Sequence, residues 1–174
     1  MSGESHCYQM LCGARISAIE VEQLSWGQGL LEISVPEGAL KFPKTASDEE
    51  LLVGVRRWVD LLSEDRFSEA YNLTAHDSYH AWTPDLIRSV VAGYGMPHEP
   101  ENHEYRISKI SQTEGGPSPR WEVERWQDAQ PGSRVGFIWF DLPLDGEWSD
   151  LTATFEIVQD DEHYVLVLQD IHVF

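Results

Sequence analysis

The densest group of side chains able to carry acid–base chemistry lies between residues 76 and 82. It consists of His76, Asp77, Tyr79, His80 and Trp82. An isomerase or a dehydratase needs a base, often Asp or His, and a hydrogen-bond donor such as Tyr that stabilises a developing oxyanion. Asp77 with His80 would supply that base. The simpler interpretation, in which these residues end a helix and pack beneath it, is favoured because their spacing is not diagnostic.

A second pair with similar potential stands near the C-terminus. Asp170 and His172 are two residues apart on an expected strand, so they share a face and the carboxylate can orient the imidazole. Leu166 and Leu168 fall on that face too, which favours a core histidine over a catalytic dyad. Tyr94 is a further candidate donor. In an enzyme or a small-molecule binder, the pocket would comprise Asp77, Tyr79, His80, Tyr94, Asp170 and His172.

The remaining potential ligands do not predict a metal ion or a cofactor. Two His and three Glu occur between residues 98 and 104, but Pro97 and Pro100 break the segment, so no rigid geometry is implied. Cys7 and Cys12 lack a second Cys pair or a nearby His pair, and we expect free thiols. The sequence has no glycine-rich phosphate-binding loop followed by Lys. It also has no Gly-x-Ser-x-Gly turn of the kind that carries a nucleophilic serine.

The composition places a large negative charge on a folded body. The chain has 174 residues, of which 41% are hydrophobic and 11% aromatic, and this suits one domain with a real core. It carries 30 acidic against 12 basic side chains, for a formal net charge of −18, and such a surface repels nucleic acid. No apolar run approaches the ~20 residues of a membrane span. We therefore expect a cytoplasmic protein that binds neither nucleic acid nor a membrane.

The acidic excess is greatest in the last forty residues, 135 to 174. This stretch has no Lys or Arg, yet its apolar alternation predicts strands. Its nine carboxylates are Asp141, Asp145, Glu147, Asp150, Glu156, Asp160, Asp161, Glu162 and Asp170. A negative field without local counter-charge favours a basic partner, whereas the plainer interpretation of the charge is solubility.

The first half of the chain predicts an N-terminal extension followed by helices. Residues 15–23 and 30–35 resemble strands around a Trp-Gly-Gln-Gly turn, and residues 36–46 read as a linker, so we expect a hairpin extension over residues 1–46. A capping box at Ser47 to Glu50 begins a helix with apolar residues at helical spacing. We expect a second short helix opened by Ser63 or Asp65, and a third that is capped by Thr83 and ends near Gly93.

From residue 104 the hydrophobic period changes to two, which is typical of strands. The expected strands are 105–112, 121–127, 134–142, 151–158 and 164–174. Helices followed by an antiparallel meander define an α+β domain over residues 47–174. The strand that begins at Arg134 is apolar on both faces, so either a partner covers its second face or the sheet curls around a pocket.

This element order resembles the nuclear-transport-factor-two-like or cystatin-like α+β cone. The stretch from Trp58 to Tyr71 is similar to that superfamily's first helix pair, and the closing Asp170 to Phe174 is similar to its last strand. The resemblance implies N-terminal helices packed on a curved antiparallel meander sheet. It also implies a range of functions, because the superfamily includes isomerases, dehydratases, small-molecule binders, interaction modules and some bacterial toxin-immunity proteins.

Together these observations favour a non-enzymatic interaction module that covers a basic protein, of which an immunity protein that neutralises a toxin is one form. Charge would speed association, and exposed members of Trp121, Trp126, Trp139 and Trp148 would hold the complex. The expected contact residues are Asp145, Glu147, Trp148, Asp150, Asp160, Asp161 and Glu162. The alternatives are the small-molecule pocket described above, acting as an isomerase, a dehydratase or a plain binder, and a homodimer through the open sheet face.

Overall fold

The structure is a computed structural model that describes residues 33–94, 103–126, 134–159 and 162–173. Within these residues the chain forms three α-helices and a seven-stranded open sheet. The expected α+β class is therefore confirmed. The closer likeness to the cystatin-like cone stays a prediction.

Two of the three helices begin where the sequence places their caps. Helix α1 spans Asp48–Ser63, and the Ser47 hydroxyl accepts the Glu50 N–H while the Glu50 carboxylate accepts the Ser47 N–H. Helix α3 spans Pro84–Ala92, with the Thr83 hydroxyl accepting the Leu86 N–H at 3.1 Å. Both predicted N-termini are therefore confirmed. Each cap stabilises its helix because it accepts a backbone N–H that has no partner within the helix.

Helix α2 spans Phe67–Leu73 and corrects one expectation. Its N-cap is Arg66, and no side chain caps it. Neither Ser63 nor Asp65 opens this helix. Ser63 is the last residue of α1, and Asp65 takes a positive φ of 64° in the turn between the helices. The turn therefore uses Asp65 for its backbone conformation, which Asp tolerates better than most residues.

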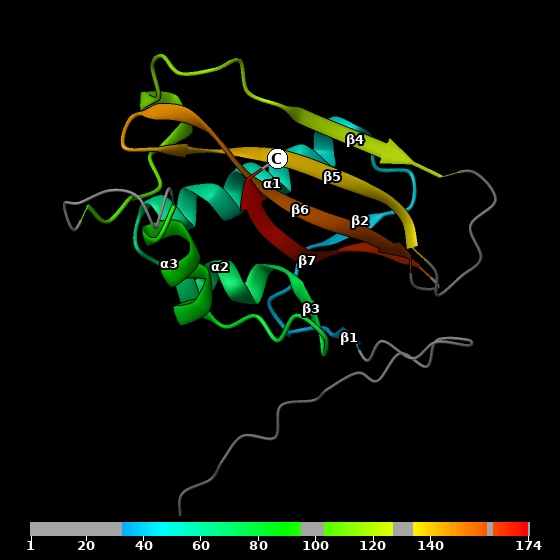
Figure 1. Cartoon of the computed structure of the whole chain (residues 1–174). Coiled ribbons are helices and arrows are strands. Elements are labelled where there is room, and N and C mark those ends of the chain that lie inside the picture. Colours follow the sequence, from blue (N-terminus) through cyan, green and yellow to red (C-terminus); the bar gives the residue numbers. More distant parts are fainter. Residues whose placement is uncertain (1–32, 95–102, 127–133, 160–161, 174) are drawn as a thin grey trace, which may run out of the picture.

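The strands form one sheet, and the meander occupies one side of it up to an edge (Figure 1). They are β1 Ile33–Ser34, β2 Lys41–Pro43, β3 Ala75–Asp77, β4 Trp121–Arg125, β5 Arg134–Leu144, β6 Glu147–Gln159 and β7 His163–Val173. Their order is β1-β3-β7-β6-β5-β4, and β2 also pairs with β7. Strands β4 to β7 are antiparallel to their neighbours, as the meander predicted, whereas β3 runs parallel to β7.

Two expectations about strands were wrong. The strand predicted at residues 105–112 is absent, because Ile107 makes only an isolated bridge to Leu144 and residues 110–112 form a 3-10 turn. Conversely, His76 and Asp77 do not end a helix but lie on β3. Three residues are too few to show an alternating pattern, and β3 is defined by its pairing with both β1 and β7.

Residues 33–46 pack as part of the same body. Strand β2 lies within the expected linker and pairs with β7, and Ile33 and Val35 contribute to a small buried cluster. Phe42 reaches α1 at Gly54, where an added Cβ would lie 2.5 Å from the end of its ring. Most of the predicted hairpin, residues 15–32, lies outside the described residues.

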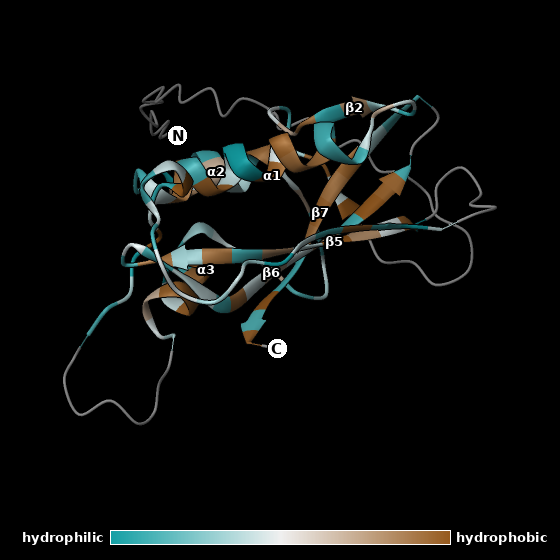
Figure 2. Ribbon diagram, turned by 90° about the horizontal axis from the view of Figure 1, so that it is seen from above, coloured by the Kyte–Doolittle hydropathy of each residue, from teal (hydrophilic) through white to brown (hydrophobic). Residues whose placement is uncertain are grey.

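Helices α1 and α2 lie on one side of the sheet (Figure 2), and α1 packs its apolar face on it. Trp58 from α1 meets Phe155 from β6 edge to face, with ring centroids 5.2 Å apart. Buried side chains of β5, β6 and β7 complete this layer, among them Ile138, Phe140 and Leu168. We call the covered side the inner face of the sheet and the opposite side the outer face. In the described residues no helix is long and apolar enough to cross a membrane.

Candidate functional site: a groove on the outer face

The outer face carries two rows of side chains that run across the central strands. Side chains alternate along a strand, so the neighbours of buried Ile138 and Phe155 point away from α1. The first row pairs Trp139 on β5 with Thr154 on β6, and Thr154 with Asp170 on β7. The next row runs from Asp141 through Thr152 to His172. The sheet register thus brings Trp139, Asp170 and His172 together.

A one-residue bulge in β7 decides which way Asp170 points. The register shifts between Thr154 and Phe155, so that Thr154 faces Asp170 while Phe155 faces Leu168, and Gln169 is the extra residue. Leu168 therefore packs in the core, and Asp170 lies on the outer face. Without the bulge, residues two apart would share a face. The expectation that Asp170 and His172 share a face with Leu166 and Leu168 was wrong for this reason.

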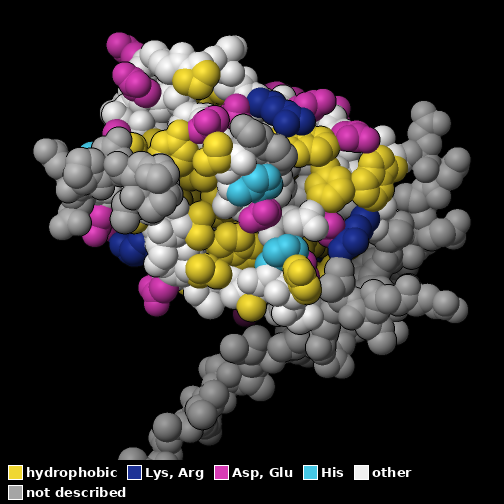
Figure 3. Space-filling model, in the orientation of Figure 1, with side chains coloured by type: hydrophobic (Ala, Val, Ile, Leu, Met, Phe, Trp, Pro, Cys, Tyr) yellow, Lys and Arg dark blue, Asp and Glu magenta, His cyan; other side chains and the backbone are white. Residues whose placement is uncertain are grey.

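These side chains line a groove of about 280 Å³ on the outer face. Its lining residues, which we call the groove residues, are His80, Phe137, Trp139, Thr154, Gln169, Asp170 and His172. Figure 3 views this face, where histidine and acidic side chains lie close together near the centre among hydrophobic side chains. The groove lies on the outer face rather than between the helices and the sheet.

His80 enters the groove from the segment that follows β3, and Asp77 holds it. The Nδ1 atom of His80 lies 2.8 Å from Oδ2 and 3.0 Å from Oδ1 of Asp77, and the His80 backbone N–H donates to Oδ1 at 2.7 Å. Asp77 is buried. Further along the same segment, Trp82 donates from Nε1 to the Gln169 carbonyl at 3.0 Å. The segment is therefore fastened to the β7 bulge, and the ring is fixed with Nδ1 toward the carboxylate.

A second His–Asp pair lies across the groove. The Nδ1 atom of His172 is 2.9 Å from Oδ2 of Asp170, and Oδ1 of Asp170 also accepts the Ile171 N–H at 2.8 Å. The side chains of both residues are partly exposed, at 40% and 48%. In its neutral form an imidazole that donates from Nδ1 presents Nε2 as an acceptor. His80, whose Nδ1 is hydrogen-bonded to Asp77, can therefore act as an acceptor in this groove when it is neutral.

Aromatic side chains continue the outer face beyond the groove. The rings of Trp126 and Phe137 are 5.4 Å apart, and those of Phe137 and Trp139 are 5.7 Å apart. The Arg120 guanidinium lies 4.7 Å from the centre of the Trp139 ring. We call Trp126, Phe137 and Trp139 the aromatic row. Sequence reasoning did not place Phe137 at a site, although the two-sided apolar pattern of this strand was a signal for it.

Glu156 lies beneath the groove as a buried carboxyl group that sequence reasoning did not assign to a site. It is 2% exposed, and Arg134 donates from Nε to its carboxylate at 2.7 Å. Burial raises the pKa of Glu156, and the Asp77 charge raises it further, whereas Arg134 and Gln169 lower it. The Asp77 carboxylate thus adds negative potential behind the groove residues, whereas the raised pKa of Glu156 and its bridge to Arg134 reduce the charge that Glu156 contributes.

Three other residues with potential acid–base chemistry, Tyr94, Tyr79 and His76, do not line the groove. Tyr94 donates its hydroxyl to Asp150, and this bond raises the pKa of Tyr94 to about 12. Tyr79 is 76% exposed, and its ring meets that of His80 edge to face at 4.9 Å. His76 is buried in the opposite direction, stacked on Tyr71 at 3.7 Å. The groove therefore unites His80, Asp170 and His172, with Asp77 behind, but neither Tyr79 nor Tyr94 lines it.

The acidic residues expected to form a contact rim are divided between two ends of the sheet. Asp145 and Glu147 lie at the β5–β6 turn, and Glu162 lies at the other end of β6. His103 donates to Asp145 at 2.6 Å, and Trp148 packs 5.3 Å from Trp121. Asp160 and Asp161 lie outside the described residues. The role of this rim in binding stays a prediction.

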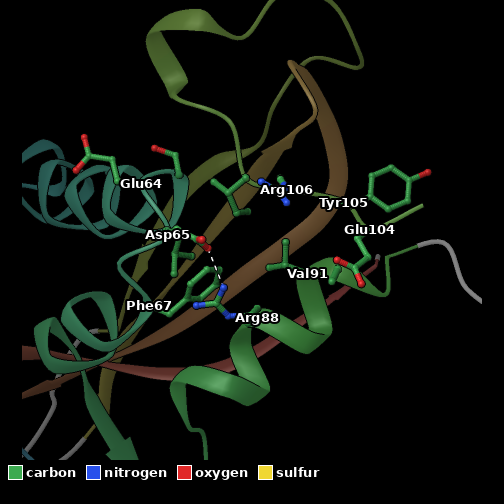
Figure 4. A pocket seen from close by; sticks show the side chains of 12 residues that line it. Glu64, Asp65, Phe67, Arg88, Val91, Glu104, Tyr105 and Arg106 are labelled. Atoms are coloured by element: carbon green, nitrogen blue, oxygen red, sulfur yellow. Dashed lines mark hydrogen bonds and ion pairs between the residues drawn. The ribbon is translucent and has the colours of Figure 1, made fainter. Parts of the chain in front are cut away.

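A second hollow of about 310 Å³ lies where α1, α3 and residues 104–107 meet. Figure 4 shows Arg88 reaching from α3 toward Asp65, with 2.9 Å between Nη1 and Oδ1. The same guanidinium stacks on Phe67 at 4.3 Å. The Arg88 charge is thus paired with Asp65 at an exposed position. In the described part of the chain, no three His, Cys, Asp or Glu gather closely enough to hold a metal ion.

Comparison with known proteins places the chain in a family without assigning a function. Residues 59–174 match the family described as a domain of unknown function, DUF7668. The match takes in α2, α3, the segment that carries Asp77 and His80, and the whole meander. No curated protein and no solved structure matches the chain. The function must therefore be argued from the residues described above.

Proposed function

Because this chain belongs to the DUF7668 family of domains of unknown function, we propose from its own residues that it is a non-enzymatic interaction module. It binds a positively charged protein on the outer face of its sheet. The single observation that carries this proposal is the groove, in which the aromatic row adjoins the Asp170–His172 and Asp77–His80 pairs. This face combines apolar contact area with negative charge.

The architecture supports an interface more than a reaction pocket. Core side chains fill the space between α1 and the sheet, so the aromatic surface that adjoins the groove is that of the outer face. Partly exposed aromatic side chains are typical anchors of protein interfaces, because they bury much area and lose little conformational freedom. The net charge of −18 would steer a basic protein toward this surface.

Among basic partners, we propose a toxin that this chain neutralises as an immunity protein. The support is the acidic surface together with the cone resemblance, since that superfamily includes immunity proteins. On this proposal the chain acts by covering a surface of the toxin and needs no cofactor. The binding residues are the groove residues and the aromatic row, and the acidic turns contribute long-range attraction.

A second candidate function is a small-molecule pocket, which the Asp77–His80 geometry favours. A buried carboxylate that fixes an imidazole through Nδ1 is the arrangement of a general base. A reaction would also need a group that stabilises developing negative charge. Tyr79 and Tyr94, the donors expected for that role, do not line the groove.

The proposal is tested with paired affinity baits in lysate from the source cells. The wild type and Asp170→Arg are used as baits, and bound proteins are identified by mass spectrometry. We expect the wild type alone to retain a basic protein, which binds one to one when both proteins are purified. Its dissociation constant should rise steeply with salt. Equal retention on both baits, an acidic partner, or affinity that is insensitive to salt would overturn the proposal.

A further inference from the structure

The chemistry of the groove specifies the group that it receives. Its polar lining offers acceptors, namely the Asp170 carboxylate, the Gln169 side-chain carbonyl and Nε2 of His80 when that ring is neutral. Among the residues that the structure describes, no Lys or Arg lines it. Behind it stand the buried carboxylate of Asp77, which is paired with His80, and the buried Glu156, which is bridged to Arg134. A hydrogen-bond donor with positive charge therefore complements this lining.

The aromatic side of the groove favours a flat cation over a compact one. Phe137 and Trp139 form one wall, next to the carboxylate of Asp170. A guanidinium can stack on an aromatic ring while its N–H groups bond to a carboxylate in the plane, whereas an ammonium cannot do both as well. The chain already shows the contact, because Arg120 places its guanidinium 4.7 Å from the Trp139 ring centre.

We infer that the groove is a binding site for the guanidinium of an arginine side chain. This inference rests on the proposed function, since the arginine would belong to the basic partner. The guanidinium lies against the aromatic wall and donates to Asp170 and to Nε2 of His80. A groove of about 280 Å³ has room for the end of one such side chain. One partner arginine would thus be the anchor of the complex.

The test uses a probe that carries this group alone. Nα-acetyl-arginine methylamide is titrated into the full chain labelled with ¹⁵N, and Nα-acetyl-citrulline methylamide serves as a nearly isosteric neutral probe. We expect the arginine probe to shift the Trp139 indole signal and the Thr154 and Asp170 amides, with a dissociation constant on the order of 1 mM. The citrulline probe should bind about tenfold more weakly, because its urea group carries no charge.

Two variants locate the site. Asp170→Asn should weaken the arginine probe about tenfold, whereas Glu147→Gln, on the β5–β6 turn, should change it less than about twofold. The amide spectrum of each variant also reports whether the fold is retained. Equal binding of the two probes to the wild type, or shifts confined to residues outside the groove, would overturn the inference, and this comparison needs no variant.

Failure of this inference can be told from failure of the proposed function. If a basic protein binds the wild type but not Asp170→Arg, while the arginine probe does not bind, the arginine site is refuted and the interaction module stands. If the arginine probe binds in the groove but no basic protein is retained, the interaction module is refuted. The groove is then a site for small guanidinium compounds.

Discussion

Asp77 holds His80 through both carboxylate oxygens: they share the ring Nδ1–H, at 2.8 and 3.0 Å, and Oδ1 also accepts the backbone N–H, at 2.7 Å. The carboxylate is buried and the imidazole lines the outer-face groove. A single side chain thus fixes both the path of the chain after β3 and the orientation of the ring. This link joins the parallel strand β3, which the sequence did not reveal, to the groove.

Replacing Asp77 with Asn tests the structural part of this link. The amide keeps one acceptor oxygen but loses the charge and brings a donor group toward the Nδ1–H of His80. We expect Asp77→Asn to lower the free energy of unfolding by about 1–3 kcal/mol, measured by urea denaturation. Asp60→Asn, at an exposed position on α1, should change it by less than about 0.5 kcal/mol. Equal effects of the two substitutions would contradict the role given to Asp77.

His76 should make the free energy of unfolding fall as the pH drops below neutrality. It donates from Nε2 to the Tyr71 carbonyl at 2.7 Å, and burial lowers its pKa below the ordinary value of 6.5. As the pH drops below that value, the unfolded chain takes up a proton that the folded chain refuses. The free energy of unfolding therefore falls as the pH drops from 6.5 to the lower pKa of the folded state, by up to about 1.4 kcal/mol per pH unit.

The variant His76→Phe isolates this contribution. Phe keeps an aromatic ring against Tyr71 but cannot bind a proton. Denaturant unfolding of both proteins from about pH 7 to about pH 5 should show a shallower loss of stability in the variant. Parallel curves for the variant and the wild type would show that His76 does not hold its neutral form in the fold.

Glu156 should have the opposite effect on the pH dependence of stability. Burial raises its pKa above the ordinary 4.5, so the folded chain holds the proton more tightly than the unfolded chain does. The associated stability is fully present below 4.5 and is lost as the pH rises through the folded pKa. Glu156→Gln cannot ionise, and Gln can still accept from Arg134. The stability of this variant relative to the wild type should increase as the pH rises from about 4 to about 8.

Unfolding free energies of Glu156→Gln and the wild type, measured at matched pH values, check this expectation. Glu147→Gln, at an exposed position on the β5–β6 turn, is the matched control and should not show the trend. A difference that stays constant with pH, or that shrinks as the pH rises, would show that Arg134 outweighs burial and holds Glu156 ionised.

Gly54 tests whether residues 41–43 pack on α1. Ala normally stabilises an exposed helix position by about 1 kcal/mol relative to Gly. Here an added Cβ would lie 2.5 Å from Cζ of Phe42 and 3.2 Å from Cδ1 of Leu40. We expect Gly54→Ala to destabilise the protein by about 1–2 kcal/mol, and to cost less in a Phe42→Leu background, as measured by thermal or urea unfolding. A stabilised single variant would contradict the packing of Phe42 on α1.

The parts of the fold that the sequence predicted are those with strong local signals. The capping box at Ser47, the Thr83–Pro84 start of α3 and the alternating strands of the meander are each determined by nearby residues. Strand β3 and the bulge at Gln169 depend on pairing with distant strands, so no local pattern encodes them. The error about which face Asp170 occupies follows directly from the unseen bulge.

The candidate site was predicted in part for the same reason. Asp77, His80, Asp170 and His172 were identified by residue type and close spacing, which the sequence displays. Their assembly into one groove depends on β3 lying beside β7, and the aromatic wall depends on the register of β5 with β6. Tyr94 was expected near them but is drawn instead to Asp150, more than fifty residues away in the chain.

The central claim is that a basic protein binds the groove on the outer face rather than the acidic turns. The most direct measurement compares the affinity of the purified partner for Asp170→Arg and Glu147→Arg, two variants with the same change in net charge. The account predicts that Asp170→Arg weakens binding at least about a hundredfold, or about 2.7 kcal/mol, whereas Glu147→Arg weakens it only severalfold through long-range attraction. Equal losses in the two variants, or a larger loss in Glu147→Arg, would contradict it.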